Sequence, residues 1–269
     1  MTKIVATFRE LHRQSTPLIL PNAWDAASAR VFESLGAKAI ATTSAGVAWA
    51  LGYQDGRGLP FEEALGAARR MARVLTVPLS IDIEHGYAED PKVVADNVLR
   101  LADLGVAGIN IEDGTDPASV LAAKIEAIRN ALAKAGTDLY VNARTDVFLA
   151  SLVEPAKLVD ESIQRGKLYA SAGADGLFLP GVSKPVDIEA VAGAVSVPLN
   201  VMAWPGLADA ETLGKLGVRR LSAGSSIAQV LLGAARQLGQ DFLQTGSSAP
   251  KLDTFMNYAE LQALFPAGR

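Results

Sequence analysis

Cysteine is absent from the 269-residue chain, which excludes a disulfide framework, a thiolate nucleophile, a cysteine-ligated zinc and an iron–sulfur cluster. A basic surplus is missing too, because 25 Lys and Arg face 29 Asp and Glu. The net charge of −4 therefore argues against nucleic acid and acidic lipid surfaces as partners. No stretch approaches the roughly 20 apolar residues that span a bilayer. Residues 1–10 contain charge too early for a secretory leader, so we expect a soluble, cytoplasmic protein.

The chain is rich in apolar residues, at 49%, with 20% charged residues, and this is ample for a sizeable core. Eight short β-rich runs alternate with helical patterns, and each run predicts a strand that pairs in parallel with its neighbours. The runs begin near Pro17, Ala39, Pro78, Gly108, Leu139, Gly176, Pro198 and Arg219. Eight such units in this length favour a (β/α)₈ TIM barrel over an open doubly wound sheet, and no turn reads Gly-x-Gly-x-x-Gly.

Two regions divide the chain. Residues 1–243 form the predicted barrel, ending in a long apolar helix over 226–243. Residues 244–269 contain a small polar linker, 244–250, and one more helix over 251–265, which packs either on the barrel or on a neighbouring subunit. His12, in the first helix, is expected at the surface.

Acidic side chains gather at the predicted carboxyl ends of the third to fifth strands, where barrels of this type carry their active sites. Asp82 and Glu84 are two residues apart, which places both carboxylates on one side of a strand. Glu112 ends the next run. Converging acids repel unless a cation lies among them, and Mg²⁺ prefers such oxygen ligands. The alternative is a buried layer of acids, water and Arg144 without a metal.

Arg144 ends the fifth run, and its guanidinium fork matches a carboxylate of a small di-acid or 2-oxo acid. The alternative is a structural ion pair with Glu112 or Asp146. The small residues 43–46 end the second run and can offer backbone N–H groups to an oxyanion. Asp55, in the polar loop that follows, is either a general base or a turn residue.

Five short motifs occur in order along these elements. They are TTSAG at 42–46, LG-x-x-D at 51–55, D-x-E-x-G-Y at 82–87, E-D at 112–113 and A-R-T-D at 143–146. Together they resemble the isocitrate lyase/phosphoenolpyruvate mutase superfamily, in its phosphoenolpyruvate mutase-like branch, over about residues 4–236. The resemblance implies a barrel with its eighth helix swapped between subunits of a dimer or tetramer. It also implies Mg²⁺, or Mn²⁺ in its place, and a 2-oxo or 2-hydroxy acid that reacts through a pyruvate enolate.

The resemblance also implies roles for individual residues. Asp82, Glu84 and Glu112 match the metal-site acids, and Arg144 matches the arginine that binds the substrate carboxylate. Asp55 matches the acid after the second-strand loop. Substrate-binding positions of the family correspond to Thr43, Ser44, Ala45, Gly46 and Asn200.

Departures from the family pattern narrow the activity. Residues 114–119 lack the Lys-Lys-Cys-Gly-His run of isocitrate and methylisocitrate lyases, which argues against both activities. Phosphonomutases carry a lysine directly after E-D, and here Gly114 stands there. His85 is either a replacement acid or base or a partner of the metal's ligands. We expect a Mg²⁺-dependent carbon–carbon lyase, of which oxaloacetate decarboxylation is the minimal version. The alternatives are phosphonopyruvate P–C chemistry and a non-catalytic 2-oxo-acid binding protein.

Overall fold

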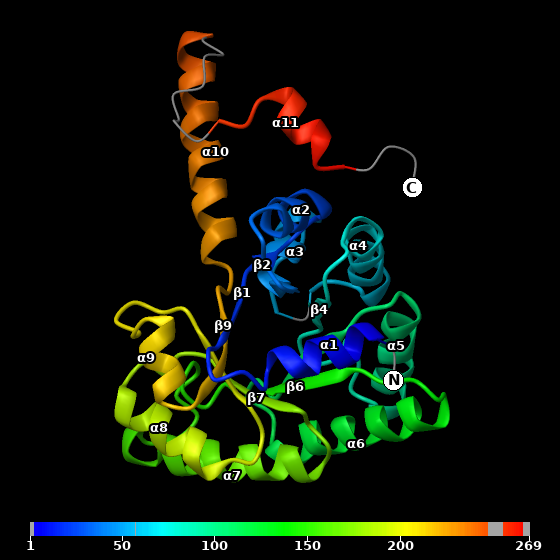
Figure 1. Cartoon of the computed structure of the whole chain (residues 1–269), viewed down its shortest axis with the longest axis vertical. Helices are drawn as coiled ribbons and strands as arrows, with labels where there is room; N and C mark the ends of the chain where they lie inside the picture. Colours follow the sequence, from blue (N-terminus) through cyan, green and yellow to red (C-terminus); the bar gives the residue numbers. More distant parts are fainter. Residues whose placement is uncertain (1–2, 57, 247–254, 266–269) are drawn as a thin grey trace.

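A computed structural model describes residues 3–56, 58–246 and 255–265. Its strands are all parallel and form one sheet that closes almost completely into a barrel, in the order β1-β9-β8-β7-β6-β5-β4-β3-β2 (Figure 1). The strands are β1 (Leu18–Leu20), β2 (Asn22–Ala23), β3 (Ile40–Thr42), β4 (Leu79–Asp82), β5 (Gly108–Glu112), β6 (Tyr140–Arg144), β7 (Gly176–Leu179), β8 (Leu199–Met202) and β9 (Val218–Ser222). The predicted barrel is confirmed.

The first predicted strand is split into β1 and β2 at Pro21. Proline has no N–H to give to a ladder, so pairing is interrupted there. β1 pairs with β9, with Leu18 opposite Arg220, and β2 pairs with β3, with Asn22 opposite Ala41. The two short pieces therefore join the two ends of the sheet.

Helices separate the strands as the sequence predicted. They are α1 (Lys3–Leu11), α2 (Ala26–Ser34), α3 (Ser44–Ala50), α4 (Phe61–Val74), α5 (Pro91–Asp103), α6 (Ala118–Lys134), the 3₁₀ turn η1 (Pro155–Lys157), α7 (Leu158–Ser171), α8 (Pro185–Ala194), α9 (Ala210–Lys215), α10 (Ser226–Thr245) and α11 (Tyr258–Ala263). Several starts have a side-chain cap: Asp25, for example, accepts the Ser28 amide and begins α2. The short helix α3 was not predicted, and it follows the TTSAG motif directly.

Helix α1 covers the amino-terminal end of the barrel. Phe8 and His12 are buried there, at 0% and 1% exposure, and the His12 ring stacks on Tyr140 with centroids 4.2 Å apart. His12 Nδ1 lies 2.7 Å from the carbonyl oxygen of Phe8. The expectation that His12 lies at the surface is wrong, because α1 plugs the barrel with its apolar face instead of lying on the outer wall.

Helix α10 leaves the barrel and projects away from it (orange in Figure 1). Ala228 is its buried residue, whereas Val230, Leu232 and Leu243 are 71%, 55% and 85% exposed. The helix runs two residues past the predicted end and stops at Gly246, whose φ of 66° suits a left-handed cap. The rest of the predicted linker lies outside the described residues. Helix α11 is shorter than the predicted 251–265, part of which also lies outside them.

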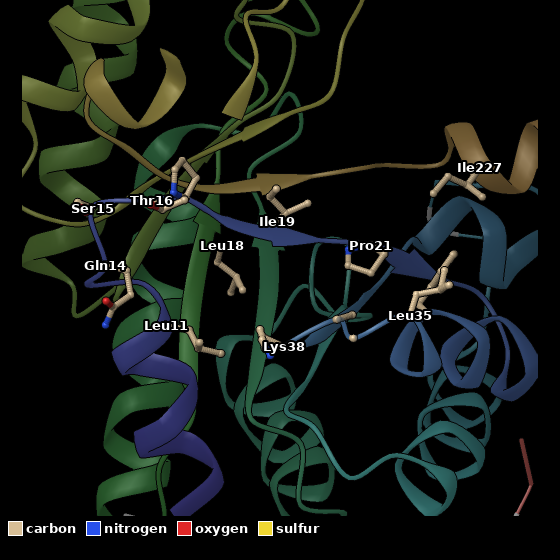
Figure 2. A pocket seen from close by; sticks show the side chains of 14 residues that line it. Leu11, Gln14, Ser15, Thr16, Leu18, Ile19, Pro21, Leu35, Lys38 and Ile227 are labelled. Carbon is tan, nitrogen blue, oxygen red and sulfur yellow. The ribbon is translucent and has the colours of Figure 1, made fainter. Parts of the chain in front are cut away.

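An apolar groove of about 710 Å³ lies on the outer wall of the barrel beside β1 (Figure 2). Leu11, Ile19, Phe32, Leu35 and Ile227 are among the residues that line it. Ile19 points outward from β1 and is 61% exposed. In a TIM barrel the helix after the last strand packs over the outer wall, and here α10 extends away instead.

Candidate active site at the barrel mouth

The carboxyl ends of β4, β5 and β6 bring three of the predicted site residues to one edge of the barrel. Asp82 ends β4, Glu112 ends β5 and Arg144 ends β6. The register places Asp82 opposite Asn110, and Glu112 opposite Arg144. Parallel pairing therefore brings acids and arginine that are far apart in sequence into contact at the mouth.

Arg144 makes ion pairs with two carboxylates. Its Nε and Nη2 donate to Asp146 Oδ1 and Oδ2 at 2.6 and 3.0 Å, and its Nη1 lies 2.8 Å from Glu112 Oε2. The alternative prediction for Arg144 was an ion pair with Glu112 or Asp146, and both pairs are present. They raise the pKa of Arg144 despite its burial, so the guanidinium stays charged.

The acids at the mouth outweigh this single arginine. Burial raises the pKa of Asp82, with the Asp55 charge adding to the effect and Arg144 opposing it. Burial, together with the charges of Asp82, Asp146 and Glu84, raises the pKa of Glu112 to about 8, again against Arg144. The mouth therefore holds more carboxyl groups than Arg144 alone can neutralise, and both raised pKa values favour the protonated form when no further cation is present.

Glu84 lies with Asp82 and Glu112 in what we call the acid cluster, but its backbone conformation is not the one expected. β4 ends at Asp82, so strand alternation does not extend to Glu84, whose φ is 50°. This left-handed backbone is costly for a residue with a side chain and is commonly found where function demands it. The Glu84 carbonyl accepts the Glu112 amide at 2.9 Å, and its amide donates to Asp82 Oδ1 at 3.3 Å. The turn keeps Glu84 buried beside the other acids.

The acid cluster fits a hard divalent cation in its chemistry. Asp82 and Glu112 offer oxygen donors close together at a buried place with a single arginine, and carboxylate oxygens are the ligands that Mg²⁺ favours. Across the ranges that the structure describes, no three His, Asp or Glu side chains are arranged as a complete ligand set. Mg²⁺ commonly binds through one or two carboxylates and keeps several waters, so such a set is not required.

The TTSAG segment places the amino end of α3 against the acid cluster. Thr43 caps α3, and its Oγ1 accepts the Gly46 amide at 3.4 Å. The Ser44 side chain opposes, as a smaller effect, the rise in the pKa of Asp82 that burial causes. The amides of Ser44 and Ala45 belong to the first helical turn, which has no intrahelical acceptors for them. Gly46 instead serves close packing, because a Cβ there would lie 2.9 Å from the Trp24 Cβ.

Asp55, His85 and Tyr87 lie on the loops around the mouth. Asp55 is exposed, and its charge acts on both Asp82 and Tyr87. His85 is half-buried, its carbonyl accepts Lys124 Nζ at 2.9 Å, and its ring centroid is 6.3 Å from that of Tyr87. Burial and the charges of the acid cluster raise the pKa of Tyr87. Sequence reasoning missed Tyr87, although it belongs to the D-x-E-x-G-Y motif.

Below the mouth, five buried side chains form a closed ring of hydrogen bonds across the barrel. Asn142 Nδ2 donates to Asn110 Oδ1 at 2.9 Å and to Asn200 Oδ1 at 3.0 Å. Ser222 contacts Asn200 Oδ1 at 3.3 Å and accepts Arg220 Nε at 3.3 Å. Arg220 Nη2 closes the ring on Asn110 Oδ1 at 3.1 Å.

The ring changes the expected environment of Asn200. Its Nδ2 donates to the carbonyl of Val201 at 2.8 Å, so protein partners use both ends of its amide. Sequence reasoning missed Arg220 and Ser222. Their spacing of two within the last strand, which places both side chains on one face of it, is the signal that could have revealed them.

Comparisons with known proteins agree with this fold. The phosphoenolpyruvate phosphomutase family profile matches residues 8–243. An uncharacterized protein of Mycobacterium tuberculosis H37Rv is 38% identical over 262 residues, which is 96% of this chain and 95% of that protein. An oxaloacetate decarboxylase of Bradyrhizobium sp. is 30% identical, over 89% of this chain and 84% of its own length. The crystal structure of a candidate phosphonomutase from Burkholderia cenocepacia matches with a TM-score of 0.84 and 37% identity, covering 89% and 100% of the two chains.

No helix in the described part of the chain combines the length and apolar character that crossing a membrane requires.

Proposed function

The chain belongs to the phosphoenolpyruvate phosphomutase family, and from that premise we propose that it is a divalent-cation-dependent lyase. Its substrate is a small 2-oxo or 2-hydroxy dicarboxylate in which a carbon–carbon bond is broken, as in oxaloacetate decarboxylation. The observation that carries the proposal is the arrangement at the mouth, where Arg144 lies against Glu112 and Asp146 in a cluster that holds more carboxyl groups than one arginine can neutralise. A 2-oxo acid matches that arrangement, because an arginine can bind its carboxylate with two hydrogen bonds while a divalent cation binds the keto oxygen beside it.

Each side chain at the mouth has a task in this reaction. Mg²⁺ or Mn²⁺, when bound, supplies positive charge to the keto group as negative charge develops there. Asp82, Glu84 and Glu112 hold the cation directly or through water. Arg144 binds and orients a substrate carboxylate. The amides of Ser44 and Ala45, in the first turn of α3, stabilise the negative charge that develops on the keto oxygen. Thr43 caps α3 and Gly46 lets it pack against Trp24, so both hold these amides in place, while Asn200 belongs to the ring of buried side chains below the mouth.

Asp55 and His85 are proposed as the groups that move protons. Both lie on loops at the rim of the barrel, above the ring of five buried side chains. At the rim, solvent can exchange protons with them. After decarboxylation an enolate carbon must gain one proton, and a rim group or its bound water can deliver it. Asp55→Asn and His85→Gln, assayed separately, identify which of the two changes the pH profile of turnover.

The test is pyruvate release from oxaloacetate, followed by coupled oxidation of NADH, with added Mg²⁺ or Mn²⁺ and with EDTA. We expect cation-dependent pyruvate formation that oxalate, a planar enolate mimic, inhibits. A parallel assay with phosphonopyruvate tests P–C chemistry, the alternative favoured by the similarity to the Burkholderia protein. Oxalate binding without turnover of either substrate would instead support a non-catalytic 2-oxo-acid binding protein.

We further propose that the chain assembles by exchange of α10. The projecting helix exposes Val230, Leu232 and Leu243, and the groove beside β1 offers an apolar surface of the kind such a helix covers. A second copy's α10 lying in this groove gives a dimer, and dimers of dimers give a tetramer. Ile19→Asp, in the groove, should dissociate the assembly in light scattering coupled to size exclusion. Val93→Asp, an exposed apolar residue on α5, is the matched control that should not.

A further inference from the structure

Arg144 has two carboxylate partners of different quality. Asp146 makes two aligned hydrogen bonds, at 2.6 and 3.0 Å, with Nε and Nη2. Glu112 Oε2 lies at 2.8 Å from Nη1, but it lacks the alignment of a hydrogen bond and has no hydrogen-bond partner. Asp146 therefore fixes the orientation of the guanidinium, whereas Glu112 makes a charge contact with it.

Asp146 is itself held from below. Its backbone amide donates to Asp113 Oδ1 at 3.0 Å. Asp113 Oδ2 accepts the Tyr169 hydroxyl at 2.6 Å and Arg165 Nη1 at 2.8 Å, and the Asp113 side chain is 0% exposed. A continuous line of hydrogen bonds thus connects α7, through Asp113 and Asp146, to the guanidinium of Arg144.

Asp146 occupies one edge of the Arg144 guanidinium, and this determines which edge is left to bind another carboxylate. A guanidinium has five N–H donors in a rigid plane, and Asp146 takes the Nε hydrogen and one on Nη2. The end edge, formed by Nη1 and the second Nη2 hydrogen, is the other geometry that accepts a carboxylate with two bonds. That edge faces the acid cluster, since Glu112 already lies against Nη1.

We propose that Asp146, supported by Asp113, is a positioning residue that holds Arg144 with its end edge directed at the substrate carboxylate. The inference rests on the proposed function, because it takes Arg144 as the group that binds substrate. Removing Asp146 leaves the charge of Arg144 in place and frees its orientation. Misplacement of a positioned group by about 1 Å can lower a reaction rate by about 100-fold, and we expect a loss in oxalate affinity of the same order, roughly 10- to 100-fold.

The experiment measures oxalate binding by calorimetry with saturating Mg²⁺, on the full chain and on Asp146→Ala, Asp146→Asn and Tyr169→Phe. Asp146→Asn keeps one acceptor oxygen and should lose less than Asp146→Ala. Tyr169→Phe removes one hydrogen bond to Asp113 without touching Arg144, and should weaken binding by about 2- to 5-fold. Asp138→Asn is the matched control. Asp138 also holds an arginine, with Arg9 Nη2 at 2.9 Å, but in the half-buried cluster beside α1.

A second readout keeps the inference separate from the proposed function. The Arg144 Nε–H signal in ¹⁵N spectra should be sharp in the wild type and in Asp138→Asn, and broadened or lost in Asp146→Ala. Folded Asp146→Ala that binds oxalate within twofold of wild type, or retains that signal, overturns the positioning role. Wild type that binds no oxalate overturns the proposed function, and the Nε–H signal still decides whether Asp146 fixes Arg144.

Discussion

His12 gives the protein a predictable weakness to acid. Desolvation lowers the pKa of its ring to about 3, and the nearby charges of Arg220 and Arg9 act in the same direction, while the hydrogen bond to Phe8 opposes them. The groups that face the ring are Arg220 from β9, Arg9 from its own helix and Tyr140 from β6. None of these offers a negative charge near neutral pH, so the imidazole stays neutral in the folded protein.

The magnitude follows from linkage. The ordinary pKa of the ring in the unfolded chain is 6.5, above the folded value of about 3. Unfolding therefore takes up a proton between these values, and the stabilising contribution of neutral His12 is fully present above pH 6.5 and lost as the pH falls. Each pH unit below 6.5 costs about 1.4 kcal/mol, so at pH 5 the unfolding free energy falls by roughly 2 kcal/mol from this ring alone.

The assay is urea unfolding at fixed protein concentration, from pH 7.5 to 4.5, for wild type and His12→Gln. The variant should be less dependent on pH, by up to about 1.4 kcal/mol per unit below pH 6.5, because glutamine does not titrate. Carboxylates titrate alike in both proteins and cancel in the difference. The chain has two histidines, so the variant also assigns the His12 NMR signal. Equal slopes, or a His12 signal that titrates near pH 6.5 in the folded protein, would refute the reasoning.

Three further substitutions test the mouth and the ring beneath it. Asp82→Ala should abolish Mg²⁺ binding and turnover together, and calorimetry that finds wild-type affinity for Mg²⁺ would contradict its proposed role. Arg144→Ala should weaken oxalate by about 100-fold, through loss of a charge-assisted pair, while Mg²⁺ binding remains. Asn142→Leu leaves the amide oxygens of Asn110 and Asn200 without this donor, and should lower the unfolding free energy by about 2–4 kcal/mol, measured by urea unfolding. A loss below 0.5 kcal/mol would show that water replaces the missing donor.

The repeating pattern of the sequence predicted the barrel well, because strand–helix alternation is a local property that eight successive units repeat. The split at Pro21 was harder to foresee, since it matters only once the first strand must pair on both sides. His12 was misjudged for a related reason. A polar residue in an amphipathic helix is usually at the surface, and only the closed barrel shows that α1 fills its end.

The site was predictable where polar residues interrupt buried strands, as at Asp82, Glu112 and Arg144. Glu84 shows the limit of that reasoning, because alternation presumes a continuing strand and the chain turns with positive φ after Ile83. The partners that orient Arg144 were less visible. Asp113 and Asp146 stood in the motifs, but their function depends on α7, which lies far along the sequence.

The ring of Asn110, Asn142, Asn200, Arg220 and Ser222 has a consequence for how this protein can change. Its hydrogen bonds join side chains of four β-strands. Replacing one of them leaves a polar group on a neighbouring strand without its hydrogen-bond partner, at a depth that solvent does not reach. Substitutions at these five positions are therefore tolerated only when they occur together. Laboratory evolution of a new substrate range should therefore accept changes in the rim loops freely and reject lone changes one layer deeper.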